Sequence, residues 1–501
     1  MGIIARQATL NTLLAYIGIA LGFVNVVVLY PRVLQADEFG LTRLLVSIAT
    51  IAAQVAQLGA ENTVIRYFPY FRDPARDHRG MLGQLLVFAT AMGLLAALVL
   101  LALHGYFTQV FADRNALYST HGLLLLPLVF SEVYFILLRS YSRSLRRTVQ
   151  PTFIREFVLR ILQTVLIAVQ AWHPMPFGQF MMVYTSIFIA CTGLLVVDLY
   201  RAGAWRIGWK QRWMPKRLRR SMATYSLFTL SASLAGIVLG NMDQLMIGAL
   251  LGANALTYVA HYAVAFYFGS VIATPARAVQ QAAVPLLADA WKRRDMATIT
   301  SLYRRSSLVQ LLISGFFFVL IWVGVDDLFI LLPQEYAGAA DVVIVIALAY
   351  LITSAVQMGV GIISMSRAYK LDAISSFSML AINFVADFFL IRSMGIIGAA
   401  WATLIALVSV NIFRTWFLWR RYQLWPFDSR ALLVVALILG LCFALPWVPL
   451  TGDAFMDMVL LGLLATGAYW LVAHALGLTT ELMEFAARLR TRGAAGGDQR
   501  N

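Results

Sequence analysis

Hydrophobic residues in this chain form long, nearly uninterrupted runs that are separated by short polar segments. Fourteen of these runs have close to the ~20 residues that a helix needs to cross a bilayer. They lie approximately at residues 8–30, 40–60, 81–103, 117–138, 151–171, 177–199, 221–242, 255–276, 306–325, 341–364, 371–391, 396–418, 431–449 and 455–476. The pattern predicts an all-α polytopic membrane protein with about fourteen transmembrane helices.

The composition excludes an ordinary soluble protein. The 501 residues are 61% hydrophobic and 13% charged, whereas about a quarter of the residues in soluble domains are charged. The sequence has no Gly-Lys pair and therefore no ATP-binding Walker motif, and it has no H-E-x-x-H motif. We therefore predict that the protein is not an enzyme, and we expect no catalytic residue, no metal ligand and no bound cofactor.

The distribution of positive charge predicts the orientation. The segment Arg201–Arg220 holds eight Lys/Arg and no acid, and such loops stay on the cytoplasmic side. With fourteen spans, 34 of the 39 Lys/Arg fall on that side, 3 fall outside, and Arg43 and Arg160 lie within spans. We therefore expect both termini in the cytoplasm. The net charge of +15 then faces the anionic inner leaflet, so nucleic acid is not needed to explain it.

Two polar segments outside the spans have their own predictions. Residues 277–305 show an amphipathic pattern that favours a helix lying on the lipid headgroups. The Gly-rich end of the chain, 488–501, is predicted to be a disordered cytoplasmic tail.

A weak internal repeat relates the two halves of the chain. Residues 34–41 and 251–258 both read L-x-A-[DN]-x-[FL] and occupy the same place in their half. Because six spans separate the copies, both halves would insert in the same orientation, as a parallel repeat. The predicted domains are a six-helix lobe (1–200), a basic linker (201–220), a second lobe (221–420), two additional helices (421–487) and the tail.

Three stretches resemble the polysaccharide-transporter family, the Wzx-type flippases of the multidrug/oligosaccharidyl-lipid/polysaccharide (MOP) superfamily. They are Ala36–Leu41, Asn241–Asp243 and, most specifically, Met394–Thr403, with its G-I-x-G-A-A-x-A-T pattern. The corresponding stretch of the first half, His173–Gly178, lacks that pattern. The resemblance implies a V-shaped, MATE-like transporter with two lobes in the cytoplasmic (inner) membrane. It would move a polyprenyl pyrophosphate-linked oligosaccharide to the outer leaflet for surface polysaccharide synthesis, such as that of lipopolysaccharide, alongside polymerase and assembly proteins.

Ionisable residues inside spans are the candidate site, because charges in a bilayer are costly and usually functional or paired. Arg160 lies ~13 Å into its span at ~1.5 Å per residue, with Glu156 one turn before it and Glu132 at a similar depth in the preceding span. One interpretation is that Arg160 contacts the substrate's phosphates. The alternative, which the pairing rule favours, is a structural ion pair with Glu132 or Glu156.

Other polar positions complete the candidate set. The further candidates for a substrate cavity are Arg43, Arg66, Arg277, Asn25 and Asn241, for which snorkelling, membrane anchoring or interhelical hydrogen bonds are the structural alternatives. Asp387, with Asn383 one turn earlier, is the candidate for coupling to a H⁺ or Na⁺ gradient. An ion pair between Asp387 and an arginine of another helix is the alternative.

Three other functions stay open at this point. A cation-coupled multidrug exporter of the same superfamily would use the carboxylates Asp387 and Glu132. A peptidoglycan-precursor flippase would bind the same kind of lipid pyrophosphate. A membrane polysaccharide polymerase or ligase would need a large outer loop, and the sequence predicts none.

Overall fold

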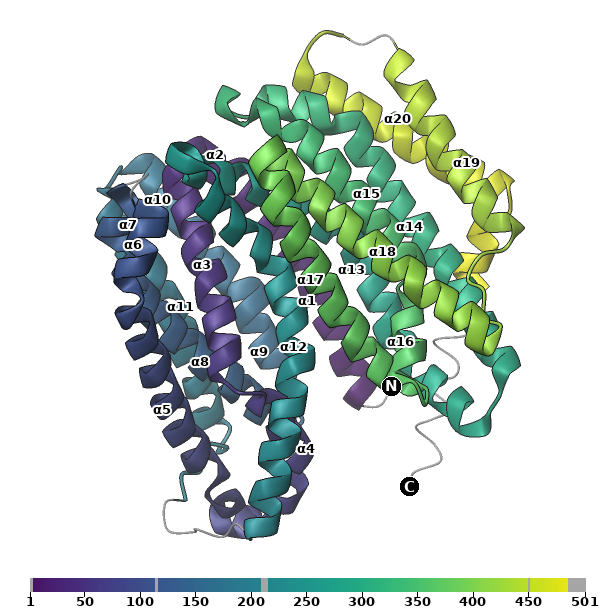
Figure 1. Ribbon diagram of the computed structural model, residues 1–501. Coiled ribbons are helices and arrows are strands. Elements are labelled where there is room, and N and C mark those ends of the chain that lie inside the picture. Colours follow the sequence, from purple (N-terminus) through teal and green to yellow (C-terminus); the bar gives the residue numbers. More distant parts are fainter. Residues whose placement is uncertain (1–2, 113–115, 209–214, 449–450, 485–501) are drawn as a thin grey trace. The chain divides into compact units, whose positions relative to one another are not determined.

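The computed structural model describes residues 3–112, 116–208, 215–448 and 451–484, and within these ranges the regular structure is entirely helical (Figure 1). Thirteen helices in the described ranges are long and apolar enough to cross a membrane. These helices confirm the predicted all-α polytopic fold. The predicted tail, 488–501, and residues 209–214 of the basic segment lie outside the described residues.

The predicted span at 151–171 is present as a helical run with a more polar composition. It consists of α9 (Val149–Phe153), a π-helical segment (Ile154–Val158) and α10 (Leu159–Trp172). Three charged residues lie in the first half of this run, so it is less apolar than the thirteen. With this run, the predicted number of fourteen is reached.

The described helices divide into two compact units: residues 6–260 form the first, and the residues from His261 onward, together with Ile3–Ala5, form the second. The first unit contains α1 (Ile3–Phe23), a π-helical segment (Val24–Leu29), α2 (Tyr30–Val33), α3 (Ala36–Ala56), α4 (Ala60–Phe71), α5 (Met81–Ala102), α6 (His104–Ala112), α7 (Ala116–His121), α8 (Leu125–Ser144), the run from α9 to α10, α11 (Phe177–Arg201), α12 (Lys216–Leu250) and the start of α13 (Ala255–Arg293). Packing thus groups α12 with the helices before it. The sequence repeat instead places residues 221–250 in the second predicted lobe, and these lobes stay a prediction.

The second unit contains the rest of α13 and the helices after it. These are α14 (Met296–Leu331), α15 (Ala340–Val356), α16 (Met358–Met365), α17 (Tyr369–Met394), α18 (Ile396–Tyr422), α19 (Ser429–Ala444) and α20 (Ala454–Ala475). Figure 1 shows α17 and α18 side by side, and α19 and α20 packed against α14.

The segment 277–305 does not form the predicted headgroup helix. Instead, α13 continues to Arg293 and α14 starts three residues later, at Met296. Leu287 on this extension is fully buried and belongs to one hydrophobic cluster with Tyr303 and Met358. Leu287 and Trp291 of the apolar stripe therefore pack against protein. A 39-residue helix is ~58 Å long and extends beyond a ~30 Å hydrocarbon layer.

A short turn connects α13 to α14. Arg294 has the positive φ of 57° that closes the turn, and Asp295 caps α14 by accepting a hydrogen bond from the Thr298 N–H at 2.9 Å. The Thr298 hydroxyl also donates to this carboxylate at 2.6 Å, and these hydrogen bonds lower the pKa of Asp295.

The G-A-A-x-A-T stretch has a packing role at the start of α18. A Cβ on Gly398 would lie 2.1 Å from the carbonyl oxygen of Leu390 in α17. Ala399, Ala400 and Ala402 are all fully buried. Small residues therefore allow the close approach of α17 and α18, as is typical of membrane helix pairs.

We predict that Gly398→Ala destabilises the protein, because the added methyl group would collide with backbone that cannot move independently. The expected loss is about 1–3 kcal/mol of unfolding free energy, measured by denaturant titration in detergent micelles. Gly440→Ala is the matched control, since nothing lies within 4 Å of its added Cβ. Equal stability of the two variants would contradict the packing role.

Candidate functional site

Two π-helical segments shape the charged region of the first unit. One interrupts the helix that begins with α1, at Val24–Leu29, and the other precedes α10, at Ile154–Val158. The side chain of Asn25 is buried and donates to the Arg160 carbonyl oxygen at 3.0 Å, while the Thr164 hydroxyl donates to Asn25 at 2.7 Å. Such wide turns concentrate at functional sites, and here they bring Asn25 against the helix that carries Arg160.

Arg160 forms an ion pair with Glu156 within its own helical run. Nη2 of Arg160 lies 2.9 Å from Oε2 of Glu156, and both side chains keep between a quarter and a third of their surface exposed. Gly18 of α1 lies so close that an added Cβ would be 2.9 Å from the same carboxylate oxygen. The pair therefore lies against α1 with one side open.

Glu132 pairs with Arg155 rather than with Arg160. Nη1 of Arg155 lies 2.7 Å from Oε1 of Glu132, whose side chain is only 7% exposed. The guanidinium also lies 5.4 Å from the ring centre of Phe135 and 5.6 Å from that of Phe188. Of the two ion pairs considered for Arg160, the structure thus has the one with Glu156 and not the one with Glu132, because the second π-helical segment presents Arg155 to α8.

Arg155 is a residue that the sequence analysis does not single out, because it lies near the predicted start of a span. The signal available in the sequence is Arg155-Glu156 followed by Arg160, which gives an acid and two bases in two turns.

Arg43 in α3 contacts aromatic rings. Its guanidinium carbon lies 5.2 Å from the ring centre of Tyr30 and 5.1 Å from that of Phe39. These two rings stack on each other at 4.8 Å. None of the ion pairs in the described ranges includes Arg43. Cation–π contact therefore accounts for its position within the protein.

The structure gives the other predicted residues separate environments. Arg66 is exposed, with its guanidinium carbon 4.2 Å from the ring centre of Tyr225. Asn241 donates to the carbonyl oxygen of Ile237 in its own helix at 2.8 Å. Arg277 is exposed on α13, in the second unit. The structure thus brings Asn25, Glu132 and Arg160 onto neighbouring helices, and it does not add Arg66 or Asn241 to them.

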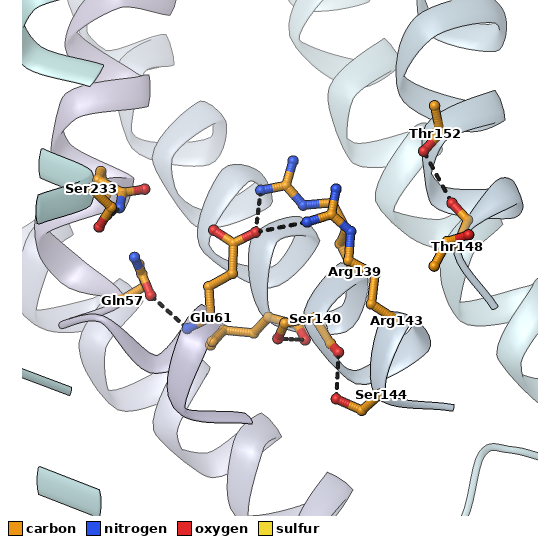
Figure 2. Close-up of polar contacts among 11 residues, drawn as sticks. Gln57, Glu61, Arg139, Ser140, Arg143, Ser144, Thr148, Thr152 and Ser233 are labelled. Carbon is orange, nitrogen blue, oxygen red and sulfur yellow. Dashed lines mark hydrogen bonds and ion pairs between the residues drawn. The ribbon is translucent and has the colours of Figure 1, made fainter. Parts of the chain in front are cut away.

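Figure 2 shows a second charged group, which we call the Glu61 cluster: Glu61, Arg139 and Arg143. Oε1 of Glu61 lies 2.8 Å from Nη2 of Arg139 and 3.4 Å from Nη1 of Arg143. The Glu61 N–H donates to Gln57 at 2.8 Å. The sequence places both arginines in a polar loop, and their spacing of four residues at the end of α8 is the one signal that they share a face.

The second unit has its own buried polar groups. Asn383 donates to Asp387 at 2.8 Å, and both side chains are fully buried in α17. Arg414 of α18, a residue that the sequence analysis does not single out, lies 3.2 Å from Asp372 and donates to Ser375 at 2.9 Å. Arg414 is thus neutralised by a carboxylate of α17, while Asn383 contacts the candidate coupling residue.

An apolar groove of about 1510 Å³ lies between α14, α15, α18 and α19. Its walls include Trp322, Trp416 and Phe443, with Asn411 and Asp428 among the few polar residues. All four helices are long and apolar enough to span a membrane. The groove can therefore hold a long hydrocarbon chain at membrane depth.

Comparisons with known proteins agree with this architecture. The sequence profile of the family described as "Polysaccharide biosynthesis protein" matches residues 4–291. The structure resembles that of the lipid II flippase MurJ in an inward closed conformation, with a TM-score of 0.73 and 12% identity over 93% of this chain and 99% of that one.

The fold also resembles that of multidrug transporters. An inward-facing MATE transporter of the MOP superfamily gives a TM-score of 0.59 and 13% identity, over 86% of this chain and 96% of that one. The MATE transporter VcmN of Vibrio cholerae in its bent form gives 0.53 and 13%, over 86% and 98%. At these identities the likeness shows the fold alone. No curated protein sequence matches the chain significantly.

We predict that Glu132→Gln destabilises the first unit, because it leaves the Arg155 guanidinium without its carboxylate among buried aromatic rings. The expected loss is about 3 kcal/mol of unfolding free energy in detergent micelles. Glu156→Gln is the matched control, because its ion pair is more exposed and should contribute about 1 kcal/mol or less. An equal loss in both variants would show that burial does not distinguish the two pairs.

Proposed function

The chain belongs to the polysaccharide biosynthesis protein family, and on this premise we propose that it is a flippase for a polyprenyl pyrophosphate-linked oligosaccharide. It carries this lipid from the inner to the outer leaflet of the cytoplasmic membrane for surface polysaccharide synthesis. Both termini lie in the cytoplasm, as the 34 Lys/Arg on one side of the predicted spans favour.

One observation carries the proposal: Arg43 and Arg160 lie within predicted spans of one unit, in α3 and α10, and Arg155 lies near the start of the run that ends in α10. Arginines at this depth are costly unless they serve a site or a pair. Arg160 and Glu156 keep exposed surface, so an anion can reach the pair. Guanidinium groups bind phosphate oxygens through two parallel hydrogen bonds, which suits a pyrophosphate that must leave water.

The apolar groove of the second unit supports a lipid substrate. A polyprenyl chain offers only hydrocarbon, and the groove walls are formed by tryptophan, phenylalanine and aliphatic side chains. We propose that the hydrocarbon chain of the lipid substrate lies along this groove. Alternating access of two helical lobes then exposes the headgroup on the outer side.

A multidrug exporter is the second candidate function. The carboxylate of Asp387 and the MATE-like fold favour it, but the arginines of the first unit repel the cationic drugs that such an exporter would carry. A peptidoglycan-precursor flippase would share the pyrophosphate chemistry, and depletion of the protein separates it from the proposal. Loss of surface polysaccharide with normal growth supports the proposal, whereas lysis supports the precursor flippase.

We predict that Arg160→Gln and Arg43→Gln each reduce export of surface polysaccharide about tenfold or more, because each variant loses charged hydrogen bonds to phosphate. Export is measured on surface glycan from cells that depend on the plasmid-borne protein, with protein levels checked by immunoblot. Arg217→Gln, at an exposed position near the start of α12, is the matched control. Normal export by both variants at normal protein levels would remove these arginines from the mechanism.

We also propose that Asp387 and Asn383 couple transport to a H⁺ or Na⁺ gradient. Asp387→Asn keeps the shape of the side chain but removes its titratable group. We expect proteoliposomes with this variant to lose the acceleration that an imposed gradient gives the wild type, while the gradient-independent rate remains. Asp341→Asn, at an exposed position in α15, should keep the acceleration. Full gradient dependence in Asp387→Asn would exclude this role.

A further inference from the structure

The Glu61 cluster holds more positive than negative charge. Arg139 and Arg143 lie one helical turn apart on the same face of α8, where two like charges repel each other. In the described ranges, Glu61 is the one carboxylate in an ion pair with either of them. The arginine side chains are 26% and 40% exposed, so a second anion has access to them. The cluster therefore has an excess positive charge that ligands from solution or from the membrane surface can reach.

Two residues in contact with Glu61 each have a buried donor that lacks a hydrogen-bond partner among the described residues. Nε of Arg139 is buried and has no hydrogen-bond partner among the described residues. Gln57 is fully buried, and its Nε2 also lacks a partner there, although its carbonyl oxygen accepts from the Glu61 N–H. Figure 2 shows Gln57 beside Glu61 and the two guanidinium groups directed at one carboxylate oxygen. One carboxylate thus leaves part of the donor capacity of this group unused.

Phosphate matches this unused capacity better than a carboxylate does. A phosphate group carries about 1.5–2 negative charges and three acceptor oxygens, and a guanidinium can bind it through two parallel hydrogen bonds. A pyrophosphate can therefore contact both arginines at once. The Glu61 carboxylate, which is attached to its own helix, would be the weaker partner.

Glu61 is connected to α12 through the break between α3 and α4. Leu58 and Gly59 form this break, with positive φ values of 48° and 76°. A Cβ on Gly59 would lie 2.0 Å from the carbonyl oxygen of Ser226 in α12, and the Ser226 hydroxyl donates to the Leu58 carbonyl oxygen at 2.7 Å. The break that contacts α12 thus lies two residues before Glu61 in the chain.

We propose that Arg139 and Arg143 are a docking site for the pyrophosphate of the lipid-linked substrate, which Glu61 occupies until phosphate oxygens displace its carboxylate. This inference rests on the proposed function, and it adds a loading site formed by the end of α8 and the start of α4. Displacement of Glu61 then loosens the contact between α4 and α12. The predicted orientation places these arginines on the cytoplasmic side, where the substrate is made.

The test measures binding of farnesyl pyrophosphate to the purified protein in detergent micelles by isothermal titration calorimetry. Glu61→Gln removes the competing charge while keeping the shape, so its Kd should be about three- to tenfold lower than that of the wild type. Arg139→Gln should raise the Kd about tenfold or more. Arg147→Gln is the control. It also removes one positive charge from this segment, but Arg147 pairs with Asp198 and not with Glu61. The Kd of this variant should match that of the wild type.

Two further ligands identify what the site recognises. Inorganic pyrophosphate should show the same order of variants with weaker binding, since it lacks the hydrocarbon chain. Nanodiscs with phosphatidylglycerol test the other source of phosphate at a membrane. Competition by this lipid that disappears in Arg139→Gln would assign the site to bulk lipid headgroups and overturn the proposal.

Hydrogen–deuterium exchange gives a second measure that does not depend on a folded Arg139 variant. Farnesyl pyrophosphate should increase exchange in residues 58–71 of the wild type, and Glu61→Gln should show that increase without ligand. Two results would contradict displacement of Glu61: unchanged hydrogen–deuterium exchange in residues 58–71 on ligand addition, or a Kd for Glu61→Gln equal to or higher than that of the wild type. Either result would leave Glu61 with only a structural role in its ion pairs. Binding by the wild type would still support the proposed function in that case, whereas no binding by the wild type would overturn both.

Discussion

The free-energy cost of a charge in hydrocarbon is the constraint on which the first unit depends. An arginine at the bilayer centre costs about 2.5–3.5 kcal/mol even on lenient scales. The structure compensates for this cost by holding Arg155 against Glu132 and Arg160 against Glu156, and by placing the Arg43 guanidinium near two aromatic rings. Each of these contacts fixes the position of one helix relative to another or the conformation of one helical run. The polar residues thus determine helix positions that apolar side chains alone would leave less specific.

The same contacts leave the arginines available for chemistry. An ion pair with one exposed side exchanges its partner at small cost, because the guanidinium exchanges one anion for another and never becomes unpaired. A fully buried pair does not offer this exchange. Glu156 and Arg160 are partly exposed, whereas the Glu132 side chain is almost fully buried. This difference favours a structural role for the Glu132 carboxylate.

Sequence reasoning could predict the features that depend on local spacing. Membrane spans follow from runs of apolar residues, and the Glu156–Arg160 pair follows from the rise and turn of one helix. The Glu132–Arg155 pair could not be predicted, because it depends on how far the π-helical segment Ile154–Val158 rotates Arg155 toward α8. The ion pairs of Glu61 could not be predicted either, because Arg139 and Arg143 lie 78 and 82 positions further along the chain and a kink at Leu58 directs Glu61 toward them.

The sign of the charge in the first unit argues for the class of substrate. In the ion pairs of α4, α8 and the run from α9 to α10, four arginines are accompanied by three glutamates: Arg139, Arg143, Arg155 and Arg160 against Glu61, Glu132 and Glu156. Arg43 of α3 adds a further positive charge beside aromatic rings. An excess of positive charge in a region of low dielectric attracts anions and opposes cations more strongly than it would in water. The fold alone does not distinguish these classes of substrate, since a lipid II flippase and a multidrug transporter share it. The excess positive charge repels a cationic drug and attracts an anionic headgroup, and this difference supports the proposal of a pyrophosphate-bearing lipid.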